Sequence, residues 1–173
     1  MLGLMATTLG FVVPRAANGQ SPLADALRAA TGRAARNLPA AADAMPADKF
    51  GFKPTPGQMS FGELVLHVAG GNARLCSWIS GTPMPDLPDL APTDPKDKLV
   101  ARLEETFTYC TAALAAVDDS KLADSVPFFG GRKITRVAAM LDLAADWADH
   151  YSQAAGYLRL NGLLPPTARR GEK

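Results

Sequence analysis

Apolar residues recur at three- and four-residue intervals in four stretches of the chain, the spacing that gives a helix one apolar face. These stretches span residues 21–45, 60–80, 94–117 and 135–161. No stretch shows the sustained alternation of apolar and polar residues that is typical of a half-buried strand. The pattern therefore predicts an all-α protein whose four amphipathic helices form a bundle.

Local signals refine the ends of these helices. Ser21 precedes a proline and is expected to cap the first helix with its hydroxyl. Ser60 and Glu63 have the spacing of a capping box at the start of the second helix. Pro39 lies inside the first helix and is expected to kink it or to separate its last turn, because proline lacks the N–H that a helix interior needs.

The apolar stripes predict which side chains face the core. In the second helix the stripe consists of Phe61, Val65, Val68, Asn72, Cys76 and Ile79. In the fourth helix it consists of Val137, Leu141, Ala144, Ala148, Tyr151, Ala155 and Leu158. Trp78 and Trp147 are expected to pack in the core or beside a site.

Long connections join the predicted helices. Residues 46–57 contain three prolines and residues 82–95 contain five, so both are expected to be extended loops. Residues 126–134 contain Gly130 and Gly131 between apolar residues, which predicts a short hairpin before the fourth helix.

The first residues differ in composition from the rest of the chain. Residues 1–13 are uncharged and mostly apolar, as in the centre of a secretory signal, but no positive leader precedes them. The alternative is a flexible or docked arm. We therefore divide the chain into a signal-like or flexible segment 1–20, a bundle 21–168 and a tail 169–173, and favour a periplasmic or secreted location over a cytoplasmic one.

The charge of the chain and the length of its apolar runs argue against a nucleic-acid partner and against a membrane span. Eighteen Lys and Arg residues balance seventeen Asp and Glu residues, which leaves a net charge of +1. The basic residues form no stripe, so we expect no nucleic-acid partner. No apolar run reaches the roughly 20 residues that a membrane-spanning helix needs.

The chain has only two histidines, and both lie on predicted helices. Asp146 precedes His150 by one helical turn, so their side chains share a face, and Asp142 lies one further turn back. With His67 they provide two imidazoles and a carboxylate, which suit zinc, nickel or iron(II) and leave coordination positions open. The alternative is that the histidines are structural and the carboxylates merely solvated.

The two cysteines lie on the predicted inner faces of the second and third helices. Cys76 and Cys110 are expected to be neighbours, either as buried thiols or as a disulfide that joins the helices. Cys76 follows His67 by nine residues, or about 13 Å along a helix, so it is a poor ligand for the same metal ion.

Three segments, residues 44–56, 60–70 and 149–166, resemble the DinB family of DinB/YfiT-like four-helix proteins. The resemblance runs from about residue 22 to residue 168. It implies a bundle that holds one divalent metal, commonly through three histidines of the second and fourth helices. His67 and His150 match two of these ligands, whereas Asp146 stands where many relatives carry the third histidine. Asp142 is then a supporting or reserve residue.

The resemblance also implies an activity and partners. Some relatives transfer small thiols or isomerise thiol adducts, so we expect a metal-dependent enzyme, a transferase or hydrolase, with a small molecule such as a thiol as its substrate. Zinc or nickel is the expected cofactor, with iron as the alternative, and a homodimer is the expected assembly. No catalytic base stands out among Asp142, Asp149 and Tyr151.

A second functional hypothesis follows from the departure at Asp146. A carboxylate in place of a histidine also fits a weakened or lost metal site. The chain would then be a non-catalytic ligand-binding or stress-response bundle.

Overall fold

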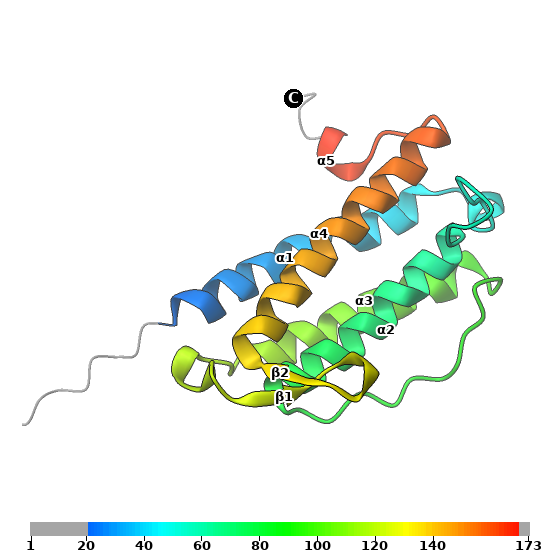
Figure 1. The fold of residues 1–173 in the computed structure, drawn as a ribbon. Helices are drawn as coiled ribbons and strands as arrows, with labels where there is room; N and C mark the ends of the chain where they lie inside the picture. Colours follow the sequence, from blue (N-terminus) through cyan, green and yellow to red (C-terminus); the bar gives the residue numbers. More distant parts are fainter. Residues whose placement is uncertain (1–20, 170–173) are drawn as a thin grey trace, which may run out of the picture.

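The computed structural model describes residues 21–169, which form a bundle of four long helices (Figure 1). The helices are α1 (Pro22–Ala44), α2 (Phe61–Ser80), α3 (Lys96–Leu114) and α4 (Arg136–Leu160). Strands β1 (Ser125–Pro127) and β2 (Lys133–Thr135) form an antiparallel hairpin before α4, and the short helix α5 (Pro166–Arg169) follows it. The predicted all-α bundle and its hairpin are confirmed. The signal-like segment 1–20 lies outside the described residues.

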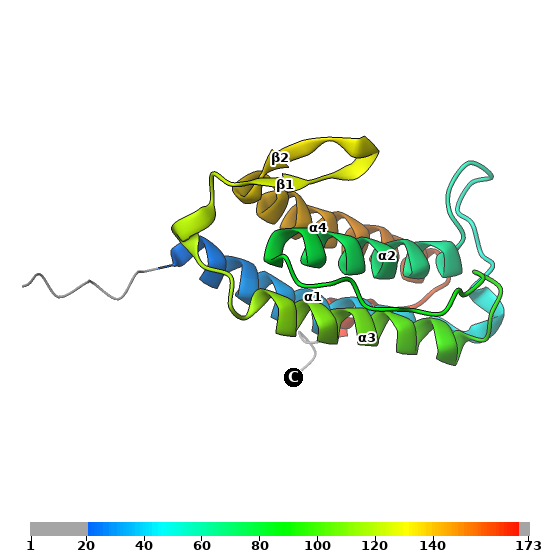
Figure 2. The same ribbon diagram turned by 90° about the horizontal axis from the view of Figure 1, so that it is seen from below.

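The four helices surround one apolar core. α1 and α2 each pack against both α3 and α4, so α1 and α2 occupy opposite corners of the bundle. The hairpin lies against α2 and α4 near the start of α4, as Figure 2 shows from below. No helix within residues 21–169 has the length and apolarity needed to cross a membrane.

The structure rules out one of the two alternatives for Pro39, the separation of the last turn. α1 continues without a break through this residue to Ala44, so the last turn does not separate. Pro39 is itself buried, and Leu38, Ala41 and Ala42 around it are buried in the core. The packing of this turn holds it in place although one backbone hydrogen bond is missing.

The inward face of α4 is also rotated from the predicted one. Leu141 is 55% exposed, and the core contacts are made by Met140, Leu143 and Trp147. α4 is rich in alanine, so its small apolar residues lie on several faces and do not fix its rotation. The observed rotation buries these three side chains and turns His150 inward.

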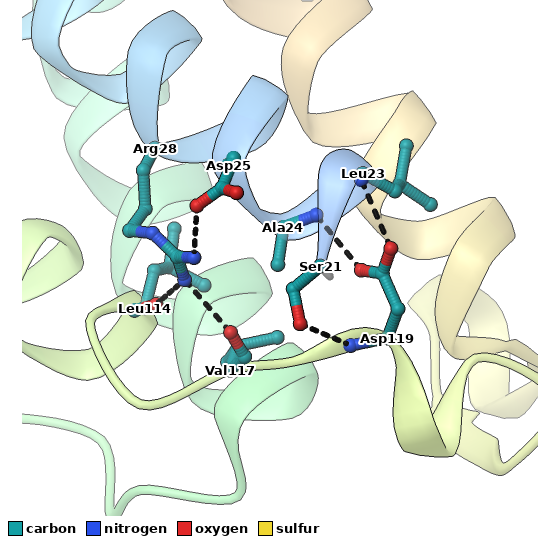
Figure 3. Close-up of polar contacts among 8 residues, drawn as sticks. All are labelled: Ser21, Leu23, Ala24, Asp25, Arg28, Leu114, Val117 and Asp119. Atoms are coloured by element: carbon teal, nitrogen blue, oxygen red, sulfur yellow. Dashed lines mark hydrogen bonds and ion pairs between the residues drawn. The ribbon is translucent and has the colours of Figure 1, made fainter. Parts of the chain in front are cut away.

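The cap of α1 comes from a distant part of the chain (Figure 3). The Ser21 side chain accepts no capping bond from α1, contrary to the prediction. Instead, the Asp119 carboxylate accepts hydrogen bonds from the backbone N–H groups of Leu23 and Ala24, at 3.0 and 2.9 Å. The Ser21 hydroxyl accepts a bond from the Asp119 N–H at 3.3 Å. The start of α1 is therefore tied to the short 3-10 turn Asp119–Lys121 that follows α3.

Asp119→Ala is expected to lower the free energy of unfolding by about 1–2 kcal/mol, since it leaves two N–H groups of α1 without their acceptor and removes a negative charge from a helix start. Urea denaturation followed by circular dichroism measures the change. Asp86→Ala is the matched control, because Asp86 is an exposed loop carboxylate without a hydrogen bond among the described residues. Equal effects of the two substitutions would contradict the capping role.

The long connection 82–95 is held against α2 and α3. Arg102 donates to the carbonyl of Pro88 at 2.8 Å, and the Tyr109 hydroxyl donates to the carbonyls of Thr82 and Pro83. At Gly62, an added Cβ would lie 2.4 Å from the carbonyl oxygen of Pro92. This close approach requires glycine at the start of α2.

A disulfide joins Cys76 of α2 to Cys110 of α3, with the two Cα atoms 5.3 Å apart. Both residues are fully buried. Of the two alternatives that the sequence left open, the structure contains the one that links the helices.

Candidate metal centre

Three predicted ligands come together where α2 passes α4. His67, Asp146 and His150 each offer one ligand atom, and these atoms all lie within 4.8 Å of one another. The two imidazole rings have their centroids 4.9 Å apart. The structure thus brings together a side chain from α2 and a pair from α4 that are distant in sequence.

Local sequence determines how each ligand is presented. On α2, the buried residues Leu64 and Val68 point into the core, so His67 lies at the edge of the buried face and is exposed. On α4, Asp146 and His150 are one turn apart. His150 is only 6% exposed. The centre therefore has one ligand open to solvent and one held in the protein.

A buried hydrogen bond sets the position of α4 against α2. The indole Nε1 of Trp147 donates to the side-chain oxygen of Asn72 at 2.7 Å, and Asn72 donates to the Thr106 hydroxyl at 3.3 Å. Asn72 and Trp147 directly follow Gly71 and Asp146. At Gly71 an added Cβ would lie 3.8 Å from the Asp146 carboxylate, so the absence of a side chain leaves room beside this ligand.

The sequence predicts Asn72 in the core stripe and Trp147 in the core or beside a site, but it does not predict the hydrogen bond between them. The available signal was a single amide in an otherwise apolar stripe, because a buried polar group needs a partner. The partner itself depends on the register between two helices, which the spacing along one helix does not reveal.

The electrostatics of the centre are dominated by the pair on α4. His150 Nδ1 lies 2.7 Å from the backbone carbonyl oxygen of Asp146 and 3.3 Å from its carboxylate. The hydrogen bond to the carboxylate raises the pKa of His150 above its ordinary value, although burial opposes this change. Since a carbonyl can only accept, Nδ1 carries a proton and Nε2 keeps the lone pair that a metal ion requires.

The remaining candidates lie outside this trio. Asp142 is exposed and makes no hydrogen bond or ion pair within residues 21–169, so its supporting role stays a prediction. Asp149 accepts a bond from Gln153, and the Tyr151 hydroxyl donates to Thr167. Neither contact identifies a catalytic base.

The donor set fits a divalent transition metal. The ligand atoms of a tetrahedral zinc ion lie about 3.3 Å apart, because each bond is about 2.0–2.1 Å long. The ligand atoms of the trio lie within 4.8 Å of one another, and a change of rotamer at the exposed His67 can bring its nitrogen closer to the other two. Three protein ligands leave further positions for water or substrate.

Comparisons with known proteins agree on the family. The chain matches the model of the DinB superfamily over residues 30–154. It is similar to the crystal structure of a DinB-like protein from Bacillus subtilis, with a TM-score of 0.64 and 18% identity over 79% of this chain and 92% of that one. A DinB-like protein from Bacillus cereus gives a TM-score of 0.66 and 15% identity, over 82% and 95% of the two chains.

A third similar structure is a mutant of a mycothiol-dependent maleylpyruvate isomerase. Its TM-score is 0.61 and its identity 16%, over 76% of this chain but only 60% of the isomerase. At these identities the structures establish the shared fold alone. No curated protein matches the chain in sequence.

Proposed function

Since the chain belongs to the DinB superfamily, we propose that it binds one divalent metal ion through His67, Asp146 and His150 and acts on a small thiol. The observation that carries the proposal is the convergence of these three side chains from α2 and α4. Zinc or nickel suits two imidazoles and a carboxylate, with iron(II) as the alternative.

In this proposal the side chains of the centre hold and orient the metal ion, and the bound thiol is the reactive group. His150 is fixed by its bond to the Asp146 carbonyl, whereas the exposed His67 leaves one side of the centre accessible to a small molecule. A bound divalent ion would lower the pKa of a thiol and favour its nucleophilic thiolate form. A transfer or isomerisation of thiol adducts is supported by the fold shared with the mycothiol-dependent isomerase.

A non-catalytic ligand-binding or stress-response role is the alternative, and one observation favours it. The Asp146 carboxylate lies 3.3 Å from His150, so these two ligands satisfy each other without an ion. A protein of this family that no longer binds a metal ion would retain such a pair. The predicted homodimer and the predicted periplasmic or secreted location stay predictions.

The proposal is tested by metal content followed by thiol binding. Elemental analysis of untagged protein is expected to give about one metal ion per chain, and Asp146→Ala is expected to lose it while Asp86→Ala, at an exposed loop carboxylate, keeps it. The cobalt-loaded protein is then expected to gain a near-ultraviolet absorption band when 2-mercaptoethanol is added. Metal without this band would favour the ligand-binding alternative, and protein without metal would contradict the proposal as a whole.

A further inference from the structure

A hollow of about 420 Å³ lies between the second half of α2 and the β1–β2 hairpin. Its walls include Arg74, Trp78, Phe128, Phe129, Arg132 and Lys133. Figures 1 and 2 show the hairpin beside this end of α2. None of the three metal-ligand candidates lines this hollow, and of its aromatic residues Trp78 and Phe128 also pack against the core.

Aromatic rings form one wall of this hollow. The ring of Trp78 lies 5.0 Å from that of Phe129 and 6.4 Å from that of Phe128, measured between centroids. Phe129 is 40% exposed although it is large and apolar. A concave surface lined by partly exposed aromatic side chains is typical of a site for a small molecule.

The charged residues of the hollow are all positive. Arg132 lies 5.1 Å from the centre of the Phe128 ring and donates to the carbonyl of Phe129, so it stabilises the hairpin. Arg74 and Lys133 make no ion pair with any residue in the range 21–169. These two cations border the aromatic wall with no carboxylate among the lining residues of this hollow, and Arg74 also lines a neighbouring hollow that contains Asp86 and Asp89.

Arg74 also connects the hollow with the candidate metal centre. It follows His67 by seven residues and precedes Trp78 by four, so the three side chains lie on the same side of α2. Its guanidinium folds back over Gly70, where an added Cβ would lie 3.3 Å from Nη1. The next residue, Gly71, lies beside the Asp146 carboxylate, so Arg74 and the centre border neighbouring residues of α2.

We propose that this hollow binds a small aromatic carboxylate. The carboxylate would pair with the Arg74 guanidinium, and the ring would lie against Trp78 and Phe129. Arginine matches a carboxylate with two parallel N–H donors, and Arg74 is exposed and so accessible to a ligand in the hollow. This binding needs no metal ion, so its failure and the failure of the proposed metal function are distinguishable.

The test compares two probes of the same shape on metal-free protein. Isothermal titration calorimetry with 2-naphthoate and with neutral 2-naphthalenemethanol is expected to give about tenfold tighter binding of the anion, as for a charge-assisted hydrogen bond. Arg74→Gln is expected to bring the affinity for 2-naphthoate down to that for the neutral probe. Phe129→Ala is expected to lower the affinity for both probes, because both rings lose a wall of the hollow.

Arg36→Gln is the matched control. Arg36 is an exposed arginine on α1 that folds over Gly32 as Arg74 folds over Gly70, with Nη1 3.5 Å from an added Cβ, but it does not line the hollow. Its substitution is expected to leave both affinities unchanged. Equal binding of the two probes, no binding of either, or equal effects of Arg74→Gln and Arg36→Gln would overturn the proposal.

Discussion

His150→Ala is expected to weaken binding of zinc by more than about 100-fold. Replacing a residue that merely orients a metal ligand already lowers metal affinity by about 10- to 100-fold, and His150 is itself a ligand in the proposed site. His150 is the one ligand that the protein both buries and orients, through the hydrogen bond from Nδ1 to the Asp146 carbonyl. The measurement is calorimetric titration of chelator-treated, untagged protein with zinc.

Loss of the buried His150 side chain can also disturb folding, so a second variant separates the two effects. His67→Ala removes an exposed ligand and is expected to reduce zinc affinity strongly while the thermal midpoint of the metal-free protein stays the same. Asp86→Ala is expected to change neither the zinc affinity nor the thermal midpoint. Unaltered zinc affinity in both histidine variants would show that the trio is not the binding site.

Cys76→Ala combined with Cys110→Ala is expected to lower the free energy of unfolding by about 3–4 kcal/mol. The disulfide closes a loop between residues 34 apart in sequence, and without it the unfolded chain regains that conformational freedom. Urea denaturation of the oxidised wild type and of the double variant measures the difference.

A reductant provides the control for this second prediction. It is expected to destabilise the wild type by a similar amount and to leave the double variant unchanged. A wild type that is equally stable with and without reductant would contradict the expected contribution. Thiol counting on protein taken from its native compartment then tests the predicted periplasmic or secreted location, where disulfides persist.

Features that depend on a few neighbouring residues were predictable from the sequence. The capping box is one of them: the Ser60 hydroxyl accepts from the Glu63 N–H at 3.2 Å, and the Ser60 N–H donates to the Glu63 carboxylate. These bonds, with the one from Lys53, lower the pKa of Glu63 to about 2. The hairpin at Gly130 and Gly131, where both residues have positive φ, is another.

Features that depend on how helices meet were not predictable in the same way. The cap of α1 by Asp119 joins residues almost a hundred positions apart, and the bond between Asn72 and Trp147 spans 75 positions. The rotation of α4 that exposes Leu141 follows from the volumes of its neighbours, not from its own spacing.

The candidate centre combines both kinds of information. The sequence by itself determined that Asp146 and His150 share one face of α4, because a helix repeats every 3.6 residues. Only the tertiary structure decided that His67 of α2 lies beside them, that Cys76 meets Cys110, and that Arg74 and Trp78 face the hairpin. A helical repeat fixes the face on which a side chain lies, whereas the packing of the core fixes which faces meet.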